Sequence, residues 1–291
     1  MNSIATSSGR ITVSLSRNGR RGVTALTPTL YWLSGALAVV ATVAGIATFF
    51  IPSFLRGPAV MNGSARGTAL VIFAVAVPTL IIAMFATSRG SLRALILWLG
   101  AVGYLLYNSL VLLFLTPANR LFLLYVAMLS LSVWSISALI AHIDVAALRE
   151  QFSTRLPVRG IAIYTMVIVT LNALVWLRGI VPTIFANGPP GFVNGTGVAT
   201  NIVYIQDLGF WLPLMAAAAI WLSRRKPWGY LIIGSVLTMW VIESISIAVD
   251  QWFGHNADPA SSIASVVFTP IFAVLAVVGI IPLYFYYRNL D

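Results

Sequence analysis

Eight apolar runs follow one another along this 291-residue chain, and each is about long enough to cross a lipid bilayer. A helix needs roughly 20 apolar residues to span the hydrocarbon core. The sequence therefore predicts an all-α, polytopic transmembrane helix bundle. The predicted spans are 30–51, 68–86, 92–115, 121–141, 158–176, 203–222, 229–253 and 263–287.

The composition supports a membrane location for most of the chain. Hydrophobic residues make up 59% of the sequence, charged residues only 8%, and the mean hydropathy is +0.95. A soluble domain keeps about a quarter of its residues charged. The lipid bilayer is therefore the expected partner. The net charge of +10 does not indicate nucleic-acid binding, because the basic residues are scattered beside the apolar runs.

The basic residues also predict the orientation. If the amino terminus is inside, the outer segments hold only four basic residues, which are Arg56, Arg66, Arg120 and Arg178. All other lysines and arginines then lie on the inner side. Positive charge is concentrated on the cytoplasmic side of membrane proteins. We therefore expect both termini to be cytoplasmic.

The chain divides into a tail and one transmembrane domain. Residues 1–28 are basic, free of acids and rich in Ser, Thr and Gly, which predicts a disordered cytoplasmic tail or, as the alternative, an organelle transit peptide. Residues 29–291 form the domain, with four spans in 30–142, an inner amphipathic linker at 143–157 capped by Asp144, and four spans in 158–288. The outer segment 180–201 is a plain loop or a flap. The two four-span groups show no convincing internal repeat.

Several kinds of chemistry are excluded. The absence of cysteine rules out disulfides, thiol catalysis, iron–sulfur clusters and Cys-ligated zinc. Lys226 is the only lysine, and it lies in a basic turn, which argues against a retinal Schiff base. Asp250, His255 and Asp258 form an unspecific acid–histidine grouping, and no catalytic or nucleotide-binding motif is present. We therefore predict no cofactor and no metal.

The span at 229–253 is the most informative because it carries Glu243 inside it and Asp250 near its end. A carboxylate within a membrane costs about 2.5–3.5 kcal/mol on insertion scales. From the helical rise, Glu243 lies about 21 Å from the inner boundary and Asp207 about 6 Å from the outer one. The two carboxylates should therefore lie at similar depth in the outer half, on antiparallel neighbouring helices.

Other polar groups reach the same level, whereas the inner halves hold little beyond Ser, Thr and Tyr. This asymmetry predicts a polar pocket, open to the outside or occluded from it, walled by the third, fifth, sixth and seventh spans. The candidate binding residues are Glu243, Asp207, Asn108, Asn172, Arg178, Tyr104, Tyr107 and Asp250.

Each candidate also has a structural interpretation. Asp207 lies in the first turns of a helix, where the helix dipole stabilises an acid. Asp250 could lie at the water interface, and Asn108 and Asn172 could join helices by hydrogen bonds. Arg178 is either an interface anchor or the ion-pair partner of Glu243.

Two stretches carry a resemblance to known sequences. They are Gly103–Ser132, and Val203–Ile233 with its D-L-G, Pro213 and an R-R-K-P-W-G-Y turn. Together they resemble a family of uncharacterised bacterial, actinobacterial multi-pass membrane proteins. The resemblance implies a bacterial plasma (inner) membrane location and brings no activity or site residues with it.

These observations favour a transporter or a protein that binds a small molecule or ion, with Glu243 linking it to protons or cations. One alternative is a membrane enzyme that acts on a lipid or lipid-linked substrate, with Glu243 or Asp207 as general base. Another is an accessory or assembly subunit without a ligand. The residues specify neither the substrate nor the oligomeric state.

Overall fold

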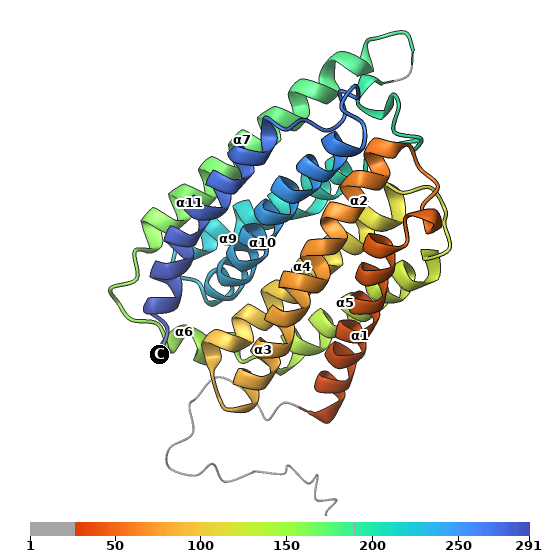
Figure 1. Cartoon of the computed structure of the whole chain (residues 1–291). Coiled ribbons are helices and arrows are strands. Elements are labelled where there is room, and N and C mark those ends of the chain that lie inside the picture. Colours follow the sequence, from red (N-terminus) through yellow and green to blue (C-terminus); the bar gives the residue numbers. More distant parts are fainter. Residues whose placement is uncertain (1–26, 189) are drawn as a thin grey trace, which may run out of the picture.

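The computed structural model describes residues 27–188 and 190–291, and Figure 1 shows a bundle of long helices. Within these residues, eight helical segments are long and apolar enough to cross a membrane, which confirms the predicted all-α multi-pass bundle. The predicted tail lies almost entirely outside the described residues. The spans are α1 (Pro28–Phe50), α2–η2–α3 (Ala59–Ser88), α4 (Leu92–Phe114), α5 (Phe122–His142), α7 (Val158–Ile184), α8–η4–α9 (Ile202–Ser223), α10 (Pro227–Ala257) and α11 (Phe268–Arg288).

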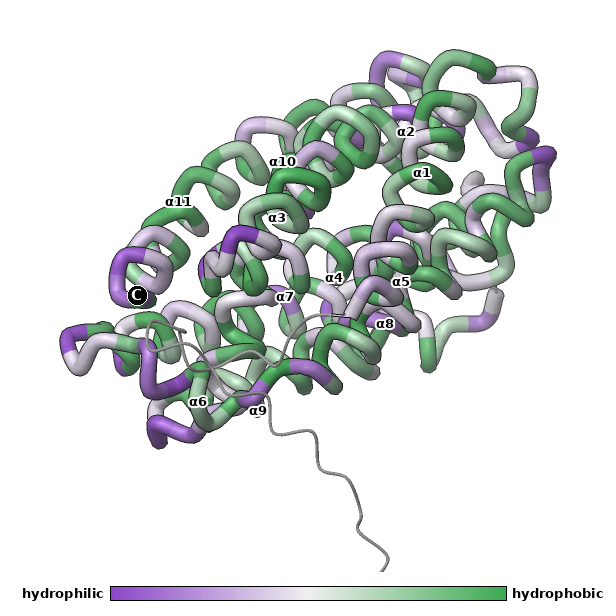
Figure 2. The backbone as a smooth tube through the Cα atoms, turned by 90° about the horizontal axis from the view of Figure 1, so that it is seen from below, coloured by the Kyte–Doolittle hydropathy of each residue, from purple (hydrophilic) through white to green (hydrophobic). Residues whose placement is uncertain are grey.

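Hydropathy follows this architecture. In Figure 2 the helices are largely hydrophobic, and the most hydrophilic segments gather at turns and at the two ends of the bundle. Many large apolar side chains point outwards, among them Trp32, Leu123 and Phe185. In water such a surface would be unstable, whereas lipid solvates it.

The second span begins earlier than predicted, at Ala59 rather than near residue 68. Glycines and polar residues lower the hydropathy there, but the small residues serve close helix packing. A Cβ at Gly63 would lie 2.6 Å from the Ala257 Cβ, and one at Gly67 would lie 2.6 Å from the Asp250 Cα. Small residues four apart are typical of membrane-helix contacts. The first part of α2 therefore packs tightly along α10.

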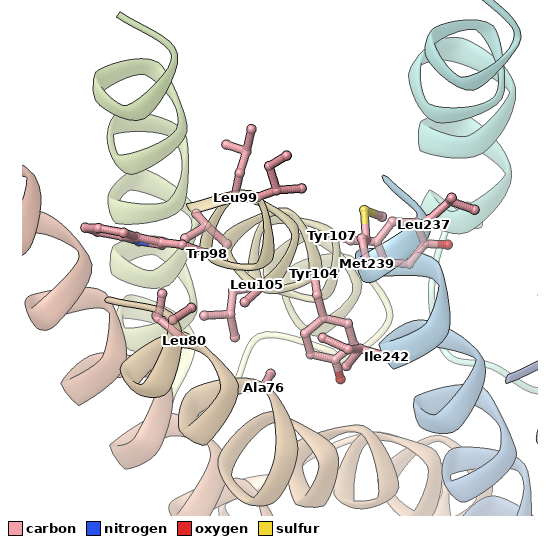
Figure 3. Packing of buried hydrophobic residues seen from close by; sticks show 14 of the residues in the cluster. Ala76, Leu80, Trp98, Leu99, Tyr104, Leu105, Tyr107, Leu237, Met239 and Ile242 are labelled. Carbon is pink, nitrogen blue, oxygen red and sulfur yellow. The ribbon is translucent and has the colours of Figure 1, made fainter. Parts of the chain in front are cut away.

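Helices α4 and α10 form the centre of the bundle, with α11 and α7 on one side and α1 and α5 on the other (Figure 1). Figure 3 shows Tyr104 and Tyr107 extending from α4 towards α10. The two backbones approach closely, because a Cβ at Gly100 would lie 2.6 Å from the Thr238 Cβ. This central contact positions the candidate site.

The segment predicted as a linker lies between α5 and α7. It contains the short helix α6 (Val145–Glu150), and the Asp144 carboxylate accepts hydrogen bonds from the Ala146 and Ala147 amides, which is the expected N-cap. Phe152 then packs against Tyr230 and Tyr286, with ring centroids 4.9 and 5.0 Å apart. The linker is thus anchored to the second group of four spans.

The structure reveals an internal correspondence that the sequence does not show. Each four-span group has its second span interrupted by one π-helical turn, η2 (Ile72–Ala76) in the first group and η4 (Asp207–Trp211) in the second. Ile72 and Asp207 are 135 residues apart, and the same shift in residue number relates the whole of η2 to η4. It also carries α3 (Val77–Ser88) onto α9 (Leu212–Ser223), and it carries Leu92, the first residue of α4, onto Pro227, the first residue of α10.

The same shift relates residues of special geometry. Pro78 and Pro213 each follow a π-helical turn, and a proline in a helix interior removes a backbone hydrogen bond that such a turn can absorb. Gly90 and Arg225 both have positive φ, 84° and 55°, in the turns that follow α3 and α9. Asn108 corresponds to Glu243. The two groups are therefore structural repeats that run in the same direction through the bilayer.

Candidate functional site

The central feature of the site is a contact between two equivalent residues of the repeats. Asn108 Nδ2 on α4 donates a hydrogen bond of 2.7 Å to Glu243 Oε2 on α10. The two residues are related by the shift of 135 residues, so equivalent positions of the two groups meet in this contact between α4 and α10. Both side chains are buried, with 1% of Asn108 and 4% of Glu243 exposed. The pair joins the two halves of the molecule.

A second hydrogen bond supports this pair one turn away. The Tyr104 hydroxyl on α4 donates to Ser246 Oγ on α10 over 3.0 Å. Asn108 Nδ2 also donates to the Tyr104 carbonyl oxygen over 3.2 Å, which holds the Asn108 side chain in place. Side chains four apart, or three apart, share one face of a helix, so both helices present these groups to each other.

Asp207 lies at the start of η4 and is 1% exposed. Its Oδ2 accepts a hydrogen bond of 2.8 Å from the indole Nε1 of Trp176 on α7. The Tyr107 side chain of α4 faces the same carboxylate. Three spans, α4, α7 and α8–η4–α9, thus meet at Asp207, and α10 reaches the neighbouring Glu243.

The residue before Asp207 is also buried. Gln206 is 5% exposed, and its Oε1 accepts a hydrogen bond of 3.3 Å from Trp211 Nε1 within the same turn. The ring of Trp211 lies 6.1 Å from that of Tyr107. Gln206 at the end of α8 and Asp207 at the start of the π-helical turn η4 therefore both direct polar side chains into the bundle, among aromatic rings. Turns of this kind occur frequently at functional sites.

Three buried polar atoms of this region have no hydrogen-bond partner among the described residues: Asp207 Oδ1, Gln206 Nε2 and Asn172 Oδ1. An unpaired buried polar atom costs about 1–3 kcal/mol. In native proteins such atoms are rare and usually meet a water, an ion or a ligand. The three atoms mark a place where the protein alone leaves hydrogen bonds unmade.

The structure brings most of the predicted site residues together, with one exception. Arg178 has an exposed side chain on α7, and Glu243 is paired with Asn108. The hypothesis of an ion pair between Arg178 and Glu243 is therefore wrong. Because α7 continues to Ile184, beyond the predicted end at 176, Arg178 lies within that helix and not at its end.

Asp250 lies at the edge of the site, where α2 crosses α10. Its Oδ1 accepts from Gln251 Nε2 over 3.0 Å, and its backbone oxygen accepts from Ser64 Oγ over 3.3 Å. Asn172 is partly buried on α7, one helical turn before Trp176. Both residues border the site rather than form its centre.

Sequence reasoning missed three residues of the site. Trp176, Trp211 and Ser246 supply hydrogen bonds that hold or flank the polar groups. Their spacing carried a signal, because Trp176 lies four residues after Asn172 and Ser246 three after Glu243, each on the same helix face. The two tryptophans are instead typical of membrane-interface residues, which concealed their role.

The cluster of Glu243 and Asp207 is closed in this structure. Two open hollows lie elsewhere, on outward-facing surfaces. One has a volume of about 580 Å³ and lies between α7 and α9 near Arg159, and the other, of about 630 Å³, lies along α1 near Trp32. Glu243 and Asp207 are thus buried side chains, and neither of these two hollows is lined by them.

Among the described residues, no basic side chain balances these carboxylates. In residues 27–188 and 190–291, the one hydrogen-bond partner of the Glu243 side chain is Asn108, and no arginine or lysine contributes to the surroundings of Glu243, Asp207 or Asp250. Asp207 and Asp250 each lie near enough to Glu243 for a charge–charge interaction with it. Such a region favours protons or other positive charge.

Comparisons with known proteins add no assignment, because no family model, curated protein or solved structure matches the chain.

Proposed function

We propose that this multi-pass membrane protein is a transporter, or binds a small molecule or ion, at a site in the outer half of the bilayer. Glu243 is the carboxylate that links the site to protons or cations. The observation that carries this proposal is the burial of Glu243 in the contact between the two repeats, with Asn108 as its hydrogen-bond partner and, within the described part of the chain, no basic residue beside it. Carboxylates placed in this way in a membrane generally serve ion or proton pathways.

The repeat is an independent argument for transport. Many transporters consist of two structural repeats, and their substrate and ion sites lie at the interface between repeats, next to interrupted helices. This chain has both features: the contact between Asn108 and Glu243 lies between the repeats, and η4 interrupts the span that carries Asp207. The analogy with the architecture of these transporters supports a transport function and is silent on the substrate.

The proposed location is a bacterial plasma membrane with both termini in the cytoplasm. The distribution of basic residues supports the orientation, and the resemblance of Gly103–Ser132 and Val203–Ile233 to a bacterial family supports the membrane. Under this orientation α4 and α10 both run from the inner to the outer side, which places Asn108 and Glu243 in the outer half.

The test is proton movement in liposomes that contain the purified full chain and an internal pH-sensitive dye. An outward potassium gradient with a potassium ionophore sets an inside-negative potential that drives cations inwards, with or without an added inward sodium gradient. We expect wild-type vesicles to acidify, and Glu243→Gln vesicles to remain near the protein-free rate. Glu150→Gln is the matched control, because Glu150 is an exposed residue of α6 and its variant should behave as the wild type.

Equal acidification by Glu243→Gln and the wild type would remove Glu243 from the mechanism. If neither protein moves protons and Glu243→Gln melts at a much lower temperature than the wild type, Glu243 has a structural role. That result would favour an accessory subunit over a transporter. A thermal-shift screen of both proteins against ions, lipids and polar metabolites then searches for a ligand, since a compound that binds the folded state raises its melting temperature.

A further inference from the structure

The turn at Gln206 and Asp207 has the properties of a binding element separate from Glu243. Gln206 Nε2 is an unpaired donor and Asp207 Oδ1 an unpaired acceptor, on consecutive residues that are 5% and 1% exposed. Their other polar atoms are held by tryptophans, Gln206 Oε1 by Trp211 and Asp207 Oδ2 by Trp176. The protein thus fixes both side chains and leaves one atom of each unpaired.

The repeat shows that the fold does not need these polar groups. The equivalent residues of the first half, Val71 and Ile72, are also buried, with 2% and 0% exposed. They stand at the start of the corresponding π-helical turn, η2, and both have apolar side chains. A buried polar pair that is only partly hydrogen-bonded is less stable than an apolar core. The second half therefore retains Gln206 and Asp207 for a purpose other than forming the turn.

Aromatic rings surround the carboxylate. Trp176 binds it directly and packs against Tyr204, with ring centroids 4.7 Å apart. Tyr107 faces it from α4 and lies beside Trp211. Phe192 of the outer loop packs on Tyr204 at 5.0 Å and extends this aromatic group outwards. Aromatic faces attract organic cations, most strongly where water is excluded.

We infer that the Gln206–Asp207 turn binds the primary ammonium group of a small organic amine that carries a hydrogen-bond acceptor next to it. The ammonium group donates to Asp207 Oδ1 and lies among the aromatic rings, and the adjacent acceptor, such as a hydroxyl oxygen, accepts a hydrogen bond from Gln206 Nε2. An alkali cation would satisfy the carboxylate but would face the Gln206 donor. This chemistry belongs equally to a free amino alcohol and to the headgroup of an aminophospholipid.

The inference rests on the proposed function for the outer-half location of the site, but it depends on different residues. The probe is ethanolamine, with tetramethylammonium, which has no N–H donor, and sodium chloride as comparisons. The purified full chain is titrated with each, and melting temperature and tryptophan fluorescence are recorded. We expect ethanolamine to raise the melting temperature saturably, and the other two to have no such effect.

Asp207→Asn tests the carboxylate with little change of shape, since the amide oxygen can still accept from Trp176. We expect it to weaken ethanolamine binding by about tenfold or more, the usual effect of losing a charge-assisted hydrogen bond. Gln206→Ala should weaken ethanolamine but not a plain alkylamine such as ethylamine. Asp258→Asn is the matched control, because Asp258 lies in the outer loop after α10 and its side chain accepts a hydrogen bond from the Ala260 amide.

The sources of the amine are separated in nanodiscs. Stabilisation by phosphatidylethanolamine over phosphatidylcholine, lost in Asp207→Asn, identifies a lipid headgroup, and stabilisation by free ethanolamine alone identifies a soluble amine. Either result supports the inference. Absence of any ethanolamine effect in detergent and in nanodiscs would overturn it, as would equal binding by Asp207→Asn and the wild type.

The two proposals fail separately. Glu243→Gln should lose proton movement and keep ethanolamine binding, whereas Asp207→Asn should lose ethanolamine binding. If wild-type vesicles move protons through Glu243 but ethanolamine does not bind, the inference is wrong and the proposed function stands. If ethanolamine binds through Asp207 but Glu243→Gln moves protons as the wild type does, the binding element stands and the role of Glu243 falls.

Discussion

The two interrupted spans have one backbone plan and opposite chemistry. In both, a π-helical turn is followed by a helix of twelve residues whose second residue is proline, α3 in the first half and α9 in the second. Before the turn, however, α2 (Ala59–Val71) has 13 residues and α8 (Ile202–Gln206) has five. The turn itself begins with Ile72 in the first half and Asp207 in the second.

This difference separates a packing role from a polar one. The long α2 reaches along α10 and closes against it through Gly63 and Gly67. The short α8 does not cover α4 in the equivalent way. Instead, Tyr107 of α4 lies beside Asp207, and one polar atom each of Gln206 and Asp207 remains without a hydrogen bond. A duplicated unit can thus keep one copy as a scaffold while the other copy carries the polar groups.

The largest effect is expected where the two halves meet. Asn108→Asp replaces the donor to Glu243 with a second buried carboxyl group, so the hydrogen bond is lost and like groups face each other. An uncompensated buried charge typically costs about 3–5 kcal/mol. We expect a corresponding fall in the free energy of unfolding, measured by thermal or chemical unfolding in detergent.

The double variant Asn108→Asp with Glu243→Gln is the control, since it exchanges the acid and the amide between equivalent positions. It should recover most of the lost stability, as the amide then lies on α10 and the carboxyl on α4. A double variant no more stable than Asn108→Asp alone would contradict the view that these residues are partners in the contact between the repeats.

A slightly smaller effect is expected at the scaffold contact. Gly67→Val places a side chain against the Asp250 backbone, where even a Cβ would lie 2.6 Å from the Asp250 Cα. Overpacking of this kind costs about 3 kcal/mol. Gly209→Val in the polar turn is the comparison, because no atom lies within 4 Å of a Cβ there. Equal melting temperatures for the two variants would show that α2 does not depend on close contact with α10.

The fold was largely predictable because membrane spans are determined by length and apolarity alone. Hydropathy located all eight spans, and the helical rise placed Glu243 and Asp207 at one depth. The start of α2 was missed because Gly63 and Gly67 add no hydropathy, although they let α2 pack closely against α10. The repeat was missed because equivalent positions hold residues as different as Asn108 and Glu243.

The site was predictable in outline but not in its pairing. Depth along each helix follows from the sequence, whereas rotation about the helix axis depends on packing with neighbours. Asn108 and Asp207 were therefore identified as candidates, but their partners Glu243 and Trp176 follow only from the structure. For the same reason the sequence left Arg178 as either an interface anchor or the partner of Glu243, and the structure shows its side chain exposed.

The comparison of the two turns can be tested by making them alike. The double variant Gln206→Val with Asp207→Ile copies Val71 and Ile72 into the second turn and removes two unpaired polar atoms. Replacing buried charged or polar groups with apolar ones is often stabilising by about 1–4 kcal/mol. We expect a higher melting temperature together with loss of ethanolamine binding. A large loss of stability would instead show that the polar turn is structural.

The smallest effect is expected at the linker that joins the halves. Asp144→Ala removes the N-cap of α6, where the carboxylate accepts from the Ala146 and Ala147 amides. Loss of such a cap costs about 1 kcal/mol. Because α6 lies at the predicted cytoplasmic side, far along the chain from the outer-half site, ethanolamine binding and proton movement should match the wild type. Altered binding in this variant would mean that the linker controls how the repeats sit against each other, and the two halves could then no longer be treated as a scaffold and a separate polar unit.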